Sequence, residues 1–394
     1  MRSHFSVRWY VNGILLGLAL FSSCGAAWAT LAQQYTLTDL GVDNLRAGPT
    51  HVTRMDKQAG TAVGWFDASG YPQAIAIYPK PGDIGPRFSL AEGVRGSQVV
   101  GFIGDFNSIS FGNYDFHAIL WDNGTPRDLG DLGSADGSSL LYSKATCINP
   151  AGDIWGHGTV QDARFDYVPL LWAGQTLLVP LPTLGGRFGQ VNACNDRGDG
   201  AGESMTPAGE THCTFWPAAG GVQDCHPQNG TTESHAIDMN NLSQLAAIAV
   251  QNGQTFSYLW AWPGIFWLMP LQGDDQSFVK AINDTGDPVG RSCLQNTCRA
   301  IAWENGQPTE LLPRVTNAPG WTLTDAVGID NNGSIIVLGT LNNEPHLARL
   351  SPIVTQSLAY VDWRWDIFNY YVDRWNVWRK SIEWYYRPDL RARR

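Results

Sequence analysis

Asparagine or aspartate recurs at one point of a pattern that repeats about every 45 residues along most of the chain. Each recurrence lies at or beside a turn, as in Asn195–Gly198 and Asp330–Gly333. Asn, Asp and Gly favour turns because they tolerate positive φ or hydrogen-bond to their own backbone. One interval is about twice as long and spans a degenerate copy. The six positions are Asp56, Asn149, Asn195, Asp238, Asn283 and Asp330. Such a period in a strand-rich chain predicts a propeller or a similar repeat array.

A second set of residues recurs with the same period. Each copy contains a short apolar segment that ends at a large side chain, and most of these are tryptophan, which suits the space between stacked sheets. The end positions are Ile77, Trp121, Trp172, Trp216, Trp260, Trp303 and Leu350. Two independent sets of positions therefore agree on seven copies.

One copy shows the strands of a single repeat clearly. Its four strand-like segments are Ser277–Asn283, Pro288–Ser292, Arg299–Trp303 and Thr309–Pro313, separated by turn residues. Four-stranded sheets repeated radially are the blades of a β-propeller. We therefore predict an all-β fold, a propeller of seven blades.

The two ends of the array match each other. The seventh copy has no fourth strand before Ser351, whereas Tyr35–Gly41 resembles a fourth strand without a blade. Pairing the two would close the ring and leave no open sheet edge. We predict a propeller over residues 30–352 that is closed by exchange of the N-terminal strand. Six or eight blades and an open solenoid are the alternatives, and an open array does not explain the matching ends.

The first 29 residues resemble a secretory signal peptide. Arg2 and Arg8 precede an apolar core at Ile14–Phe21, and Ala27–Ala29 fits a cleavage site with small residues. An alternative is lipoprotein processing at Cys24, although the residues before it match that signal poorly. We expect a secreted or periplasmic bacterial protein.

The charge balance argues against one class of partner. The chain carries 26 basic and 36 acidic residues, a formal net charge of −10. Binding to nucleic acid relies on Lys and Arg that neutralise phosphates. We therefore expect no nucleic-acid partner, and the excess of acid is consistent with a soluble, self-repelling surface.

Six cysteines follow the predicted leader, an even number in an oxidising compartment. We predict two disulfides from hairpin spacing, Cys293–Cys298 and Cys213–Cys225. Cys147 and Cys194 lie on the first strands of neighbouring blades but are offset by one position of the repeat. Since successive residues of a strand point to opposite faces, we expect these two thiols to be free or to be an unreliable pair. No Cys-x-x-Cys pair or histidine cluster accompanies the cysteines, so we expect no metal site and no cofactor.

Several segments resemble the HAF-repeat family of bacterial extracellular proteins. They are His117–Trp121, Leu129–Gly133, Leu184–Gly186 and Ala281–Asn283 with the following Val289 and Gly290. The resemblance covers about residues 35–352 and implies a secreted, propeller-like repeat protein, without an established activity. The histidine that gives the family its name is replaced here by Gln73, Phe256 or Arg299 in other copies. The resemblance therefore implies no shared catalytic histidine.

Two long loops mark a candidate ligand site. Gly104–Phe116 and Thr159–Tyr167 connect second to third strands of adjacent blades, on the face that also carries the blade-to-blade connections. Aromatic platforms beside carboxylates and an arginine suit a glycan or a protein ligand. The alternative is that these loops pack on their own aromatic side chains. The candidate binding residues are Tyr114, Asp115, Arg164, Phe165, Asp166 and Tyr167.

The motifs favour binding over catalysis. The chain contains no Gly-x-Ser-x-Gly elbow, no His-Glu-x-x-His motif and no phosphate-binding loop. We predict a binding or scaffold module at the cell envelope or outside the cell. The alternative is a carbohydrate-active hydrolase or lyase, in which a carboxylate pair such as Asp162 and Asp166 acts from the long loops.

The chain changes character after Pro352. Residues 353–394 are rich in aromatic and basic side chains, with apolar residues at steps of three or four, which predicts an amphipathic helix. Its tryptophans include Trp365, Trp375 and Trp378. Three roles stay open: packing against the propeller, lying at a membrane interface, or docking to a partner protein.

Overall fold

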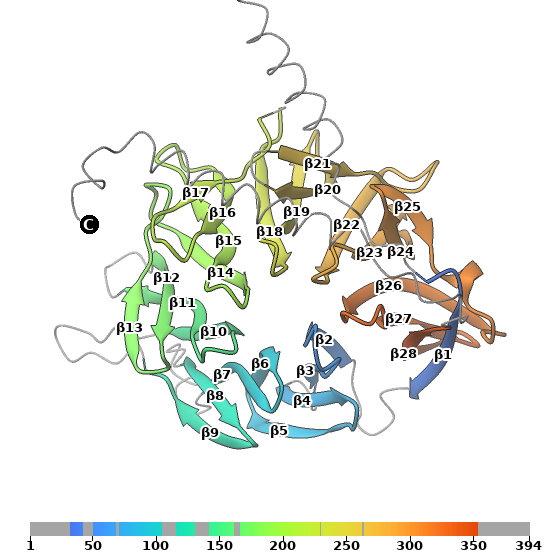
Figure 1. Cartoon of the computed structure of the whole chain (residues 1–394), viewed down its shortest axis with the longest axis horizontal. Helices are drawn as coiled ribbons and strands as arrows, with labels where there is room; N and C mark the ends of the chain where they lie inside the picture. The colour runs from blue at the N-terminus through green and yellow to red at the C-terminus, as the bar shows by residue number, and fades with distance from the viewer. Residues whose placement is uncertain are drawn as a thin grey trace, which may run out of the picture. The chain divides into compact units, whose positions relative to one another are not determined.

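The computed structural model describes residues 32–41, 50–67, 71–104, 116–130, 142–160, 166–228, 230–261 and 264–353. These residues form seven four-stranded antiparallel sheets arranged as the blades of a ring (Figure 1). The predicted seven-bladed β-propeller is therefore confirmed. The predicted signal peptide and the predicted C-terminal helix lie outside the described residues. Within those residues, no helix has the length and apolarity needed to cross a membrane.

The blades follow one another along the chain, each running from the centre of the ring outward. Blade 1 contains β2 (Thr50–Met55), β3 (Ala62–Asp67), β4 (Pro72–Tyr78) and β5 (Gly82–Arg87). Blade 2 contains β6 (Ser89–Arg95), β7 (Gln98–Gly104), β8 (Phe116–Asp122) and β9 (Thr125–Asp128). Blade 3 contains β10 (Ser143–Ile148), β11 (Ile154–Val160), β12 (Asp166–Ala173) and β13 (Leu177–Pro180). Blade 4 contains β14 (Gly189–Cys194), β15 (Gly200–Met205), β16 (Thr211–Trp216) and β17 (Gln223–Asp224).

The remaining blades repeat this order. Blade 5 contains β18 (Glu233–Met239), β19 (Leu245–Gln251), β20 (Gln254–Ala261) and β21 (Gly264–Leu268). Blade 6 contains β22 (Gln276–Ile282), β23 (Pro288–Leu294), β24 (Thr297–Glu304) and β25 (Gln307–Glu310), followed by the 3₁₀ turn η1 (Leu312–Arg314). Blade 7 contains β26 (Trp321–Ile329), β27 (Ile335–Leu341), β28 (Glu344–Pro352) and, as its outer strand, β1 (Tyr35–Gly41).

The N-terminal strand closes the ring as predicted. β1 pairs antiparallel with β28, with Leu37 opposite Leu350. Both backbone polar groups of Leu37 also bond to Asn317, whose Oδ1 accepts from the amide at 2.7 Å and whose Nδ2 donates to the carbonyl at 3.0 Å. Tyr35 is fully buried. The first ordered strand and the last blade therefore form one sheet.

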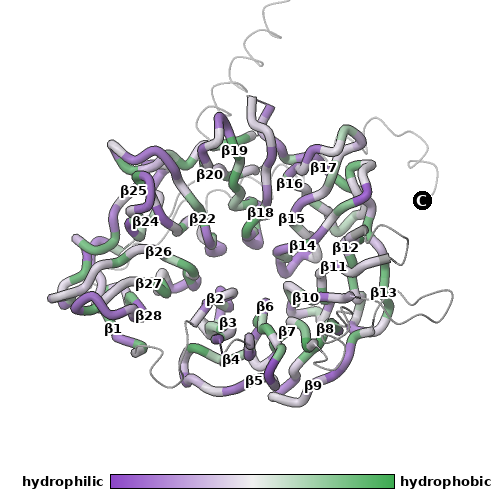
Figure 2. Tube along the Cα trace, turned by 180° about the vertical axis from the view of Figure 1, so that it is seen from behind, coloured by the Kyte–Doolittle hydropathy of each residue, from purple (hydrophilic) through white to green (hydrophobic). Residues whose placement is uncertain are grey.

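Tryptophans hold neighbouring blades together. The indole N–H of Trp172, Trp216 and Trp303, at the ends of third strands, donates to a carbonyl that follows the outer strand of the preceding blade. The distances are 2.7–2.8 Å, and all three side chains are buried. The recurring tryptophan thus fills the space between sheets and also satisfies a polar group there. Figure 2 shows apolar segments running through the blades and hydrophilic strand ends near the centre of the ring.

The recurring Asn and Asp residues link the turns between first and second strands. Nδ2 of Asn195 donates to the Asn240 carbonyl at 3.2 Å, Asn240 donates to Asn283 at 3.0 Å, and Asn283 donates to Asp330 at 3.3 Å. In blade 5 the repeating residue is therefore Asn240. The prediction of Asp238 at this position is wrong, because Asp238 lies two residues earlier on β18 and pairs with cationic side chains.

Every inner strand contains a β-bulge at the same point. At this point one residue of each inner strand has no counterpart on the second strand, and β26 has a further one at Val327; the shared residues are Thr53, Glu92, Thr146, Asn192, Ile237, Lys280 and Thr324. A bulge bends the strand and re-aims the side chains that follow it. The alternation of inward and outward residues therefore changes at this point in all seven blades.

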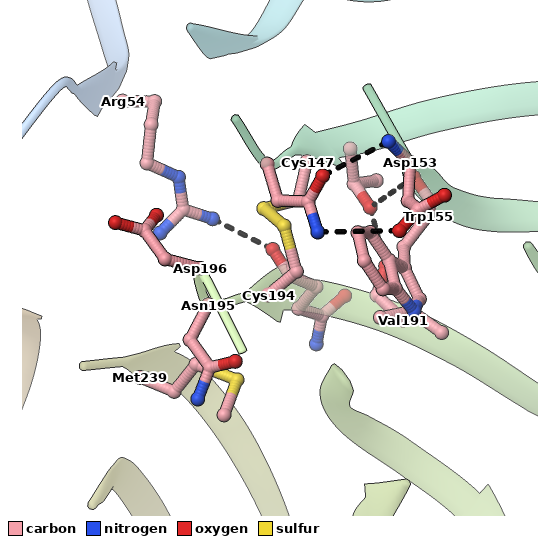
Figure 3. Close-up of a disulfide and its surroundings, with 12 residues drawn as sticks. Arg54, Cys147, Asp153, Trp155, Val191, Cys194, Asn195, Asp196 and Met239 are labelled. Carbon is pink, nitrogen blue, oxygen red and sulfur yellow. Dashed lines mark hydrogen bonds between the residues drawn. A yellow bond between two sulfur atoms is a disulfide. The ribbon is translucent and has the colours of Figure 1, made fainter. Parts of the chain in front are cut away.

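Three disulfides are present among the described residues. The two predicted hairpin pairs, Cys293–Cys298 and Cys213–Cys225, are both formed, with Cα atoms 4.1 Å and 5.1 Å apart. A third disulfide joins Cys147 on β10 to Cys194 on β14, with Cα atoms 5.8 Å apart (Figure 3). The prediction that these two thiols are free is wrong.

The reason for this error is the way in which radial sheets face one another. The front of one blade packs on the back of the next, so side chains that meet between blades come from opposite strand faces. Cys147 is the first residue after the bulge of β10, and Cys194 is the second residue after the bulge of β14. Asp238 and Ile282 have the same relation in blades 5 and 6, where the Ile282 amide donates to Asp238 Oδ2 at 2.9 Å. A contact between the inner strands of neighbouring blades therefore requires residues that are offset by one position of the repeat.

Candidate functional site

Charged side chains cross the centre of the ring on one face. Arg54 of blade 1 lies 2.9 Å from Asp238 of blade 5, and Lys57 lies 3.0 Å from the same carboxylate. Arg95 of blade 2 lies 2.9 Å from Asp196 of blade 4. We call these five residues the cross-channel clamp. The cavity beside it has a volume of about 50 Å³, enough for one or a few waters. Figure 3 shows Arg54 reaching across to the strand that carries Cys194.

The opposite face carries a row of aromatic pairs. At three successive blade boundaries, an aromatic residue at or just before the start of a third strand meets one that directly precedes the next inner strand. The pairs are Tyr71–Phe88, Phe116–Tyr142 and Tyr167–Phe188, with ring centroids 4.5, 5.7 and 5.6 Å apart. At the next two boundaries the equivalent residues are polar, Thr211 with Glu233 and Thr255 with Gln276. The aromatic pairs therefore occupy one side of the ring.

Second-strand residues connect these pairs. The Tyr142 ring is 6.5 Å from Phe102, 5.6 Å from His157 and 5.7 Å from Tyr167, mostly in tilted or edge-on contact. The side chains other than His157 are half-buried, so each keeps part of its surface open to solvent. We define the aromatic arc as Tyr71, Phe88, Phe102, Phe116, Tyr142, His157, Tyr167 and Phe188.

His157 is the buried centre of the arc. Its Nε2 lies 3.4 Å from the Tyr142 hydroxyl, and its Nδ1 has no hydrogen-bond partner. Burial, together with the charge of Lys144, lowers the pKa of His157 to about 3. Burial also raises the pKa of Tyr142 above its ordinary value. Both groups are therefore neutral at physiological pH, and neither has the pKa near 7 that suits a general base.

A cavity opens at the blade 1 end of the arc. It has a volume of about 430 Å³ and is lined by Tyr71, Pro86, Arg87, Phe88, Ile103 and Gly104. This size is typical of small-ligand sites. Phe88 has a φ of 63°, a conformation that bulky residues rarely adopt. Two backbone hydrogen bonds of 2.7 Å hold it there, from Phe88 to Pro72 and from Gly104 to Phe88. Strain of this kind is concentrated at binding and catalytic sites.

A charged pair lies beside the middle of the arc. Lys144 Nζ is 2.8 Å from Glu92 Oε1 and 5.5 Å from the centre of the Phe102 ring. Glu92 is the bulge residue of β6. The arrangement places one acceptor and one donor beside the half-buried Phe102 ring. Among the described residues, no group of three or more His, Cys, Asp or Glu side chains could hold a metal ion.

One residue of the predicted site lies in the arc. Tyr167 is its member on β12, and Asp166 begins the same strand, although the structure does not describe the Asp166 side chain. The other predicted contacts lie outside the described residues: Tyr114, Asp115, Arg164 and Phe165 of the loops, and Trp365, Trp375 and Trp378 of the tail. Sequence reasoning missed Phe88, Tyr142 and Phe188. Their shared signal was an aromatic residue directly before Ser or Gly at the start of an inner strand.

Comparisons with known proteins support the assignment of the fold. No protein-family model matches the chain, and no curated protein sequence is significantly similar to it. The β-propeller domain of the Trilobed protease from Pyrococcus furiosus, described as having an open velcro topology, is 9% identical with a TM-score of 0.50, over 84% of this chain and 98% of that chain. A puromycin hydrolase variant is 9% identical with a TM-score of 0.54, over 86% of this chain and 57% of that chain. At this identity the likeness concerns the propeller alone.

Proposed function

We propose that this chain is a bacterial binding module of the cell envelope or extracellular space, and that its aromatic arc holds a glycan. The observation that carries the proposal is the row of half-buried aromatic pairs on three successive blade boundaries, beside a cavity of about 430 Å³. Sugar rings present apolar C–H faces, and aromatic side chains provide large apolar contact area for them. Lys144 and Glu92 supply the polar groups that fix orientation.

The disulfides support the proposal that the protein is exported. Disulfides form and persist in oxidising compartments, and this propeller contains three. The predicted signal peptide at residues 1–29 agrees with that location. We further assign the chain to the HAF-repeat family, on the repeat motifs of its strands and turns.

The chemistry of the arc favours binding over hydrolysis or elimination. The histidine at its centre has a pKa of about 3, so it is a weak base at neutral pH. The carboxylate of Glu92 is held in an ion pair with Lys144 at 2.8 Å. A carbohydrate-active hydrolase or lyase would need a carboxylate pair or a base matched to neutral pH.

The test is an array of glycans probed with the full chain and with arc variants. The ligand found should bind Tyr167→Ala about fivefold more weakly, the loss expected for one stacking contact of about 1 kcal/mol. Tyr167→Phe keeps the ring and should retain the affinity. Thr211→Ala, at the equivalent position of blade 4, is the matched control and should bind normally. An array without any retained glycan, or an unchanged affinity in Tyr167→Ala, would contradict the proposal.

A further inference from the structure

A second group of side chains lies at the boundary between blades 6 and 7. It contains Lys280, the bulge residue of β22, with Arg291 on β23 and Asp325 on β26. Arg291 Nη1 lies 3.0 Å from Asp325 Oδ2. The guanidinium also lies over the Phe278 ring, 4.7 Å from its centre, which holds its plane in place. We call Lys280, Arg291 and Asp325 the blade 6–7 cluster.

The hydrogen-bonding capacity of this cluster is only partly used. Asp325 is 4% exposed; its Oδ2 accepts from Arg291, a backbone hydrogen bond from Ala326 acts on the same carboxylate, and its buried Oδ1 has no side-chain partner among the described residues. Lys280 Nζ forms no hydrogen bond or ion pair with the described residues, although the charges of Asp325 and Arg291 both act on its pKa. Buried polar groups in folded proteins are almost always paired, so unpaired ones call for a physical explanation.

The cluster also has an excess of positive charge. It holds two cations against one carboxylate in a chain whose net charge is −10. Burial lowers the pKa of Lys280 and raises that of Asp325, and each shift marks a group taken out of water without full compensation. An added anion would offset the second cation.

The position of the cluster relates it to the arc. Arg291 pairs with Ala300 on the third strand, as Phe102 pairs with Ala118 and His157 with Pro169. These second-strand residues occupy the same place in the repeat and lie at the same level of the ring. The arc occupies blades 1–4 and the cluster blades 6 and 7, so the two lie on different sides of the ring. The Arg291 side chain is 34% exposed and therefore accessible to a ligand.

We propose that Lys280, Arg291 and Asp325 form a carboxylate-binding subsite, and that the glycan of this propeller is acidic. The inference rests on the proposed function and names its ligand class. Arg291 donates to Asp325 through Nη1, and the rest of its partly exposed guanidinium is a donor for a ligand carboxylate, beside which Lys280 provides a point charge. A uronic acid carries the carboxylate that these two cations would bind.

The test compares an acidic with a neutral oligosaccharide of the same length. Trigalacturonate and the neutral trisaccharide made by reducing its carboxyl groups are titrated into the full chain by calorimetry. The acidic form should bind at least tenfold more tightly at low salt. Lys280→Met and Arg291→Gln should each remove this preference and leave binding of the neutral form unchanged. Arg299→Gln, a neighbouring arginine on β24 that already pairs with Asp274 at 2.8 Å, is the matched control and should keep the preference.

The outcomes separate this subsite from the arc. Equal affinity for the two trisaccharides, or a preference that survives in both variants, overturns the subsite. Tyr167→Ala should weaken both trisaccharides equally, so a failure of the arc has a different signature. If neither trisaccharide binds, galacturonate alone decides: binding that is lost in Arg291→Gln supports the subsite without the arc, and no binding overturns it. Thermal melting of each variant checks that the fold is kept.

Discussion

The imidazole of His157 shows how one position can take on different roles in a repeat. The equivalent residue of blade 2 is Phe102 and that of blade 6 is Arg291, so the same place serves as apolar filling, a buried neutral ring or a cation. His157 packs against the rings of Tyr142 and Tyr167 and is 4% exposed. A proton on it would be an unpaired charge close to Lys144. The folded state therefore strongly disfavours protonation.

This residue should make the propeller sensitive to acid. The unfolded chain protonates His157 below its ordinary pKa of 6.5, whereas the folded state resists protonation until about pH 3. Its contribution to stability is complete above pH 6.5 and is lost as pH falls, by about 1.4 kcal/mol per pH unit. His157→Phe, which copies blade 2, should flatten the dependence of the unfolding free energy on pH between 6 and 4, measured by urea denaturation.

A second histidine provides the control for that measurement. Burial alone would lower the pKa of His235, but its hydrogen bond and charge interaction with Glu203 outweigh burial and raise it. Its stabilising effect is complete below pH 6.5 and is lost as pH rises through the raised pKa. His235→Gln should therefore leave the slope between pH 6 and 4 unchanged. A slope that is also unchanged in His157→Phe would contradict the role given to that residue.

At the level of strands, the bulge in every inner strand decides which residues meet between blades. The disulfide between Cys147 and Cys194 uses the first and second residues after two successive bulges. It joins blades directly at the centre of the ring, whereas Cys293–Cys298 lies within one hairpin. The two crosslinks therefore constrain the unfolded chain to very different extents.

Removing the central disulfide should cost more stability than removing the hairpin one. Cys147 and Cys194 are 47 residues apart, and on the chain-entropy scale their crosslink stabilises by about 4 kcal/mol. Cys293 and Cys298 are 5 residues apart, which corresponds to about 2 kcal/mol. The variant with Cys147→Ser and Cys194→Ser should therefore lose more unfolding free energy than the variant with Cys293→Ser and Cys298→Ser. Urea denaturation without reductant measures both losses. Equal losses would contradict this chain-entropy account.

The sequence predicted these strands better than it predicted their contacts. Turn residues and tryptophans repeat along the chain, so blade number, strand order and closure could be read from their spacing. The front of one blade packs on the back of the next, so contacting side chains come from opposite strand faces, and the spacing of Cys147 and Cys194 alone does not reveal their contact. Phe88 and Tyr142 are isolated aromatics in the sequence. Only the packing of one blade on the next brings them into pairs with Tyr71 and Phe116.

The whole molecule depends on one strand supplied from the far end of the chain. β1 completes blade 7, where Tyr35 and Leu37 pack into the same core as Leu350. Without it, the backbone of β28 would lose its outer partner and the core of blade 7 would be open to water. The contact between blades 7 and 1 would then be the weakest in the ring.

A chain that lacks Tyr35–Gly41 should therefore melt at a lower temperature than the intact chain. We expect one cooperative transition that is shifted as a whole, because the opened blade borders blades on both sides. Circular dichroism in the far ultraviolet measures the shift. Thr38→Ala, at an exposed position of the same strand, is the control and should melt normally. An unchanged melting temperature after the deletion would refute closure by strand exchange.

The cross-channel clamp closes the central channel of this propeller near one face. Arg54, Lys57 and Arg95 reach carboxylates on opposite blades, and the space left beside them is about 50 Å³. A polymer could pass through the ring at this level only by breaking these ion pairs. Whatever enters from the aromatic face must leave by that face, so a long chain is gripped at its end or lies across the rim. A ligand then binds and dissociates at the same face of the ring, and the intact cross-channel clamp prevents a polymer from sliding through the ring in one direction.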